Sequence, residues 1–181
     1  ESQILPIPGE NGKYILKSNG FYCLNEDGTK ENTPAVYYFD HFEIDGTVFD
    51  GYYYHDESGK FTAGNSHMVQ ITDLKAPAKD GSGEEVSFDG CYMVNNLGKL
   101  SASPQVRYMD ELVVDKTTYN GLYYFDEYGK MQYGLIGIDF GDGTEHSAYF
   151  GNSESDGKMR TDKQTSVTED SGDRTTFFFK K

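Results

Sequence analysis

The chain alternates short apolar and aromatic runs with polar, glycine-containing turns. Four times, two glycines stand eight residues apart with an Asn or Asp three residues before the second glycine. In a β-hairpin, such an Asx side chain caps a type I turn, and glycine takes the positive φ of the bulge that follows. The pattern therefore predicts four units of strand, turn and strand. We call them the first to fourth glycine motifs: Gly20–Gly28 with Asn25, Gly51–Gly59 with Asp56, Gly90–Gly98 with Asn95, and Gly121–Gly129 with Asp126.

A longer repeat contains these motifs. Residues 20–64 recur without a gap as residues 90–134, and 18 of the 45 aligned pairs are identical. Small repeats bury a core by stacking on their neighbours, so the sequence predicts an all-β fold of stacked β-hairpin repeats forming a β-solenoid-like array. The equivalent segments 36–47 and 106–117 are each expected to add a strand pair with its own turn, such as Tyr37–Phe39 against Phe42–Ile44.

Composition shifts along the chain suggest its organisation. Pro6, Pro8 and Gly9 mark an entry arm, and Pro77, Gly81 and Gly83 among charged residues mark a joint between the two copies. Aromatic runs near the C-terminus continue the pattern with looser spacing. We therefore expect an entry arm at 1–13, a first repeat block at 14–75, a linker-like loop at 76–86, a second repeat block at 87–140 and divergent repeats at 141–181.

Charge and composition narrow the partners. Asp and Glu number 30 against 16 Lys and Arg, giving a net charge of -14, which disfavours nucleic acid and anionic membranes. No apolar run reaches the roughly 20 residues that span a bilayer, so no membrane insertion is expected. The chain opens at Glu1 without a signal-peptide pattern, which suggests a mature or trimmed segment with a possible adjoining domain.

The spelling of the fourth motif and of the C-terminal region resembles a known family. Residues 121–131 (GLYYFDEYGKM), 156–161 (DGKMRT) and 177–179 (FFF) are similar to the cell-wall-binding repeats of choline-binding, glucan-binding and clostridial toxin proteins. The resemblance implies a β-solenoid of hairpins that is secreted or displayed on a Gram-positive cell surface. It also implies noncatalytic carbohydrate binding to wall polymers or extracellular glycans.

The copies are degenerate because they contain no Trp. In choline-binding members, Trp and Tyr surround a trimethylammonium group through cation–π contacts. The position before the Tyr-Tyr-Phe run, where the family places one cage Trp, holds Phe21, Tyr52, Cys91 and Leu122 in the four motifs. A tyrosine face can instead stack on a pyranose ring while Asp or Asn binds its hydroxyls.

The candidate ligand residues follow from strand alternation. Tyr52 and Tyr54 should share one face of a strand and Tyr53 the other. We therefore select Tyr53 and its repeat equivalent Tyr123, with Asp56 and Asp126 as polar partners, for glycan contact between adjacent hairpins. The alternative function is a structural spacer or protein-interaction stalk that has lost ligand binding.

Other chemistry is not indicated by the sequence. The loop Asp139–Glu145 has glycines at the third and fifth positions, where an EF-hand needs oxygen ligands, so it is expected to be an acidic turn. The histidines lack metal-ligand spacing, and His55 aligns with Phe125, which indicates a strand ring. The recurring Asp-Glu pairs are explained by turn positions, so we expect no enzyme, no metal and no cofactor.

The two cysteines occupy apolar positions of the repeat. In the 70-residue register, Cys23 aligns with Met93 and Cys91 with Phe21. Buried free thiols are therefore favoured over a disulfide, which stays the open alternative.

Overall fold

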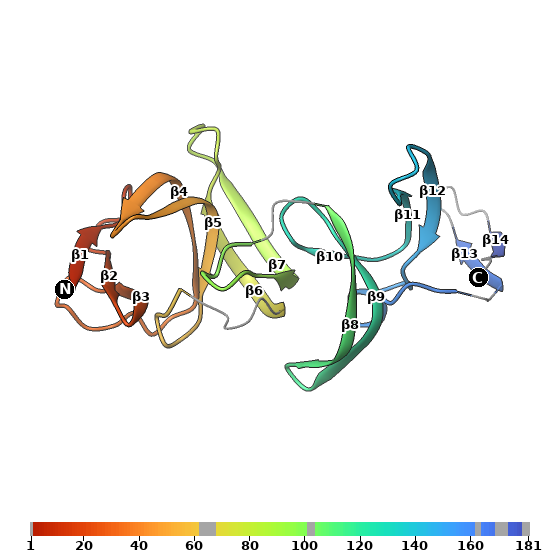
Figure 1. Cartoon of the computed structure of the whole chain (residues 1–181), viewed down its shortest axis with the longest axis horizontal. Helices are drawn as coiled ribbons and strands as arrows, with labels where there is room; N and C mark the ends of the chain where they lie inside the picture. Colours follow the sequence, from red (N-terminus) through yellow and green to blue (C-terminus); the bar gives the residue numbers. More distant parts are fainter. Residues whose placement is uncertain (1, 62–67, 101–103, 162–163, 169–173, 179–181) are drawn as a thin grey trace. The chain divides into compact units, whose positions relative to one another are not determined.

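The computed structural model describes residues 2–61, 68–100, 104–161, 164–168 and 174–178. These residues form an all-β fold of antiparallel hairpins (Figure 1), and their one helical element is a three-residue 3-10 helix, Glu154–Asp156. The strands are β1 (Gln3–Pro6), β2 (Tyr14–Ser18), β3 (Gly20–Leu24), β4 (Ala35–Ile44), β5 (Thr47–His55), β6 (Met68–Pro77), β7 (Glu85–Met93), β8 (Gln105–Val114), β9 (Thr117–Phe125), β10 (Met131–Gln132), β11 (Leu135–Asp139), β12 (Glu145–Tyr149), β13 (Gln164–Thr168) and β14 (Arg174–Phe178). Their sheets are β1-β2-β3, β10-β9-β8, β4-β5, β6-β7, β11-β12 and β13-β14.

The chain divides into two compact units that differ from the expected blocks. The first unit comprises Glu1–Pro104 together with Asp126–Lys130, and the second comprises Gln105–Phe125 with Met131–Lys181. The turn of the fourth glycine motif thus belongs to the first unit, although the strands on either side of it belong to the second. The entry arm is also more ordered than expected, because β1 pairs with β2 over four residues.

The turn chemistry of the glycine motifs is confirmed. In each turn the Asx amide receives a hydrogen bond from no side chain but donates to a backbone carbonyl beyond the second glycine, as in Asn25 N to Thr29 O at 2.8 Å. The Asx side chain caps the turn at Asp56, Asn95 and Asp126, whose Oδ1 atoms accept backbone N–H groups at 2.8 to 2.9 Å. In the first motif, Asp27 accepts from the Thr29 amide at 2.9 Å instead.

The expected extra strand pairs were wrong. Residues 35–44 form one long strand, β4, that pairs with β5, and its two middle residues, Asp40 and His41, form a bulge between Phe39 and Phe42. β8 has the same interruption between Met109 and Leu112. A bulge, unlike a turn, bends the strand without reversing it. The polar positions that suggested a turn in the sequence are therefore an outward bend of a continuous hairpin.

The same long hairpin occurs a third time, in β6–β7. Its bulge lies between Ile71 and Leu74, and Ala76 and Pro77 pair with Val86 and Glu85. The segment 76–86, which we expected to be a linker-like loop, is therefore the tip of a hairpin. Its Pro, Gly and charged residues lie at the exposed end, where no core position demands an apolar side chain.

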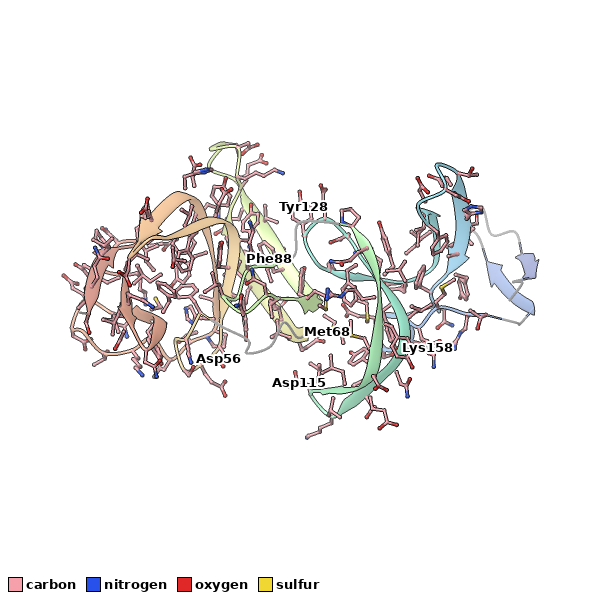
Figure 2. The ribbon with its side chains drawn as sticks, viewed as in Figure 1. Asp56, Met68, Phe88, Asp115, Tyr128 and Lys158 are labelled. Atoms are coloured by element: carbon pink, nitrogen blue, oxygen red, sulfur yellow. The ribbon has the colours of Figure 1, made fainter. Side chains whose placement is uncertain are left out.

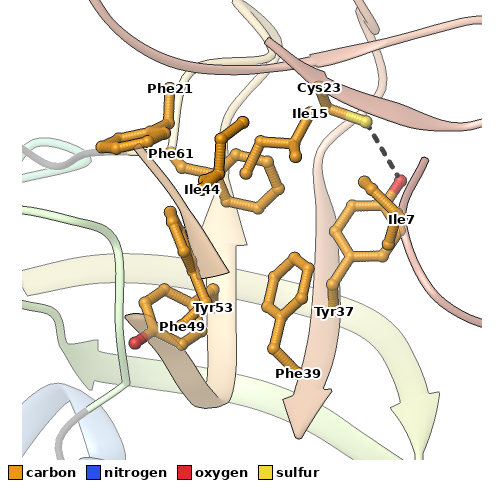
Figure 3. Packing of buried hydrophobic residues seen from close by; sticks show 10 residues of the cluster. All are labelled: Ile7, Ile15, Phe21, Cys23, Tyr37, Phe39, Ile44, Phe49, Tyr53 and Phe61. Carbon is orange, nitrogen blue, oxygen red and sulfur yellow. Dashed lines mark hydrogen bonds between the residues drawn. The ribbon is translucent and has the colours of Figure 1, made fainter. Parts of the chain in front are cut away.

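Aromatic side chains from alternate strand positions fill the core of the first unit. Tyr53 packs in one cluster, shown in Figure 3, with rings such as Phe39 and Phe49. Tyr52 belongs to a different cluster around Phe88, against which Tyr54 also packs. The expected division of these tyrosines between two strand faces is confirmed. The shared members of the Figure 3 cluster are Ile7, Ile15, Phe21, Cys23, Tyr37, Phe39, Ile44, Phe49, Tyr53 and Phe61.

Successive glycine motifs are joined by backbone hydrogen bonds. The second glycine of each motif is followed by Lys and an apolar residue, and this segment lies beside the strand of the preceding motif. The carbonyl oxygens of Gly59, Gly98 and Gly129 accept from the amides of Cys23, Tyr54 and Met93 at 2.7, 2.8 and 2.7 Å. In the second unit, the Met159 amide likewise donates to Leu122 O at 2.7 Å. Lys60, Lys99 and Lys130 form the corresponding antiparallel bridges to Tyr22, Tyr53 and Tyr92.

This pairing predicts different costs for two turn glycines. Gly28 and Gly59 both have positive φ, 80° and 69°. A Cβ on Gly28 would have no neighbour within 4 Å, whereas one on Gly59 would lie 2.6 Å from the Glu31 carbonyl oxygen. Gly28→Ala should lower the free energy of unfolding by about 1 kcal/mol through backbone strain alone. Gly59→Ala should cost about 2 kcal/mol more through overpacking.

Urea unfolding of the two variants measures this difference. Gly28→Ala is the matched control, because it replaces glycine at the same turn position without the backbone contact. Equal destabilisation by the two substitutions would contradict the close approach of successive motifs at Gly59.

Candidate functional site

A hollow of about 270 Å³ lies among the hairpins of the first unit. Three tyrosines form its aromatic wall, Tyr38 on β4, Tyr52 on β5 and Tyr128 on the turn of the fourth motif. The remaining lining residues are Asp50, Gly51, Lys79, Lys99, Leu100 and Glu127. The hollow combines ring faces with charged groups of both signs, a composition suited to a polar ligand that has flat apolar faces.

Cross-strand pairing and inter-motif contacts fix the three rings. Tyr38 and Tyr52 are direct partners in the β4–β5 register, with ring centroids 5.1 Å apart. Tyr128 meets Tyr52 edge to face at 6.5 Å. Burial raises the pKa of Tyr52, so its hydroxyl stays protonated and donates to Pro77 O at 3.1 Å. Tyr52 is thereby held in place, while Tyr38 and Tyr128 remain half-buried.

Tyr128 reaches the hollow from its place in the turn. The third position of the turn holds Asp27, Ser58, Leu97 and Tyr128 in the four motifs. Leu97 packs against the core cluster of Figure 3, and Tyr128 packs against the cluster around Phe88. Tyr128 and Phe88 are labelled in Figure 2. An apolar residue at this position therefore covers an earlier hairpin, and its occurrence in a turn is the sequence signal that we overlooked.

The four residues selected from the sequence have other surroundings. Tyr53 and Tyr123 are only 3% and 5% exposed, so their ring faces are covered by the core. Their hydroxyls accept from the Asp50 and Asn120 amides at 3.2 and 3.3 Å. Asp56 and Asp126 are the turn caps described above, and each spends Oδ1 on its own turn. The structure does not bring these four side chains together around the hollow, which instead uses the neighbouring residues Tyr52 and Glu127.

The thiol and phenol with strongly shifted pKa values lie in the core. Cys23 and Cys91 are buried and free, which confirms the expectation from the repeat register. Cys23 Sγ lies 3.5 Å from Tyr37 Oη, and burial raises the pKa of both groups. Both therefore stay protonated at neutral pH, and this pair is a core contact rather than an activated nucleophile.

His55 is a core ring, as its alignment with Phe125 predicted. Its side chain is fully buried, stacks on Tyr37 with centroids 5.6 Å apart, and donates from Nδ1 to Asp56 O at 2.8 Å. Among the described residues Nε2 finds no hydrogen-bond partner. Burial lowers the pKa of His55, so the neutral imidazole is the folded form.

The bulge of β4 gathers three residues that look scattered in the sequence. Asp40, His41 and Asp50 place one potential ligand atom each within 4.8 Å of the others, and all three are exposed. His41 Nδ1 lies 3.5 Å from Asp50 Oδ1. The equivalent bulge positions of β8–β9 are Asp110, Glu111 and Asn120, without a histidine. Exposed acidic groups are common without a bound ion, and we assign none here. The loop Asp139–Glu145 is an acidic turn in which Asp139 Oδ1 accepts three backbone amides.

No protein-family model, curated protein or solved structure matches the chain at a significant level. Within the described ranges, no helix has the length and apolar content needed to cross a bilayer. The functional argument therefore depends on the geometry of the site and on the resemblance in spelling described above.

The buried histidine predicts a pH dependence of stability. The folded pKa of His55 lies below the model value of 6.5, so the unfolded chain takes up the proton first as the pH falls. The stability that His55 contributes as a neutral ring is complete above pH 6.5 and declines below it. His55→Phe, which copies Phe125, should remove this decline and raise stability at neutral pH by about 1 kcal/mol, because the orphan Nε2 disappears.

Urea midpoints at neutral pH and near pH 5 measure the effect. His41→Gln is the control, since the His41 side chain is 77% exposed. The account of His55 would be wrong if wild type and His55→Phe lost the same stability over that pH interval.

Proposed function

We propose that this chain is a noncatalytic, extracellular repeat module that binds a cell-wall polymer or another extracellular glycan in the hollow of Tyr38, Tyr52 and Tyr128. The observation that carries the proposal is that this hollow is walled by three rings and charged groups of the first unit. Sugar rings present apolar C–H faces to aromatic rings and hydroxyls to charged side chains. The resemblance to cell-wall-binding repeats supports the same class of ligand, with Tyr52 at a position where that family places a cage Trp.

The serial pairing of glycine motifs supports a β-solenoid-like array as the architecture behind this function. Each motif offers the same backbone edge to the next, as the hydrogen bonds of Gly59, Gly98 and Gly129 illustrate. In such an array, sites recur only where side chains permit. A polymer that touches several weak sites gains affinity through the raised effective concentration of each further contact.

A spacer role is favoured for the second unit by its own residues. In the 70-residue register, Tyr52 is replaced by Leu122 and Asp50 by Asn120, while the counterpart of Tyr38 is Tyr108. Tyr108 is 64% exposed, whereas Tyr38 is half-buried beside Tyr52. The second unit thus keeps one ring of the site, and we propose that it supports the first unit without binding a sugar at this position.

Removal of a site ring should weaken glycan binding selectively. Tyr128→Ala should reduce binding to purified Gram-positive cell wall, or to a positive glycan on an array, about tenfold at low salt, because the hollow loses a stacking face. Tyr108→Ala, the matched control from the second unit, should leave binding unchanged. Co-sedimentation with wall material measures both variants, and circular dichroism checks that both are folded.

Two results would contradict the proposal. One is that folded wild-type protein binds no wall material and no arrayed glycan at low salt. The other is that Tyr108→Ala weakens binding as much as Tyr128→Ala, which would place the contact surface away from the hollow.

A further inference from the structure

Four charged side chains line the hollow without neutralising one another. Asp50 and Glu127 are acidic, and Lys79 and Lys99 are basic. The ion pairs found among the described residues join none of these acids to either lysine, and the close charged neighbour of Asp50 is His41 at 3.5 Å. Opposite charges that line one hollow and stay apart remain available to a ligand.

The two lysines are held at the hollow by other contacts. Lys99 bridges Tyr53 through its backbone, and its Cε would lie 3.3 Å from a Cβ on Gly51, so the alkyl stem crosses this glycine. Lys79, on the tip of the β6–β7 hairpin, places Nζ 5.8 Å from the centroid of the Tyr128 ring. Glycine at position 51 thus leaves room for the Lys99 stem, and the Tyr128 face attracts the Lys79 ammonium.

The charge pattern bears on the sign of the ligand. The whole chain has a net charge of -14, so a purely anionic polymer is repelled by the general field and needs local cations. A purely cationic ligand meets Lys79 and Lys99, and a purely anionic one meets Asp50 and Glu127. A ligand with both charges can pair with both sets at once.

Resting on the proposed function, we infer that the hollow prefers a zwitterionic saccharide, an amino sugar with a free ammonium and an anionic substituent. The anionic group pairs with Lys79 and Lys99, the ammonium pairs with Asp50 and Glu127, and the sugar face stacks on the tyrosines. A lysine on each approach to the hollow thereby serves specificity, while the rings supply the contact that any sugar would share.

Four related monosaccharides separate the two charges. Glucosamine 6-phosphate carries both, N-acetylglucosamine 6-phosphate carries the anion, glucosamine carries the cation, and N-acetylglucosamine is neutral. Titration is followed by amide chemical shifts of Gly51, Leu100 and Tyr128 at about pH 6.5, below the pKa of an α-amino group. We expect glucosamine 6-phosphate to bind tightest, about fivefold more tightly than either singly charged sugar.

Charge-neutral variants assign each contact. Lys79→Gln with Lys99→Gln should abolish the gain from the phosphate and keep the gain from the amine. Glu127→Gln should reduce the gain from the amine and keep that from the phosphate. Lys75→Gln is the matched control, because Lys75 lies on the same β6–β7 hairpin, pairs with Glu85 at 3.3 Å and does not line the hollow.

The outcomes distinguish this inference from the proposed function. If all four sugars shift the same amides with equal affinity and Tyr128→Ala weakens them all, the charge preference is overturned and glycan binding stands. If none of the sugars and no wall material shifts these amides, both the preference and the proposed function are overturned.

Discussion

The structure depends on one backbone contact, the pairing of each Gly-Lys-apolar segment with the strand of the preceding glycine motif. An isolated hairpin is marginally stable in water, because few of its apolar side chains are covered. The bonds from Cys23, Tyr54 and Met93 to glycine carbonyls supply the second neighbour that each strand needs. They also explain the close fit of Gly59 against Glu31 O, where a side chain cannot be accommodated.

This serial pairing also assembles the candidate site. Lys99 and Leu100 enter the hollow because their segment bonds to the strand that contains Tyr52, whose carbonyl oxygen accepts the Leu100 amide at 2.9 Å. Tyr128 arrives with the turn whose Gly129 pairs with Met93. A site built this way needs successive motifs in register, so any change that separates them would dismantle the aromatic wall without altering a single lining residue.

Local features were predictable from the sequence, and long-range ones were not. The turns, the opposite faces of Tyr52 and Tyr53, and the buried free cysteines follow from short-range patterns that the structure confirms. The β6–β7 hairpin escaped notice because its tip is polar and its strands contain few aromatic residues. The site residues were misjudged because alternation shows that Tyr53 opposes Tyr52 but not which face is the deeper one. Tyr128 could not be placed, since its partner Tyr52 is set by pairing between motifs far apart in sequence.

Hydrogen exchange at the amides of Cys23, Tyr54 and Met93 tests the central claim most directly. If successive motifs are paired as described, these amides are donors to Gly59, Gly98 and Gly129 and should exchange as slowly as the hairpin core, represented by Phe49. Exchange of these three amides at the rate of exposed turn amides, with Phe49 still protected, would show independent hairpins and contradict the account.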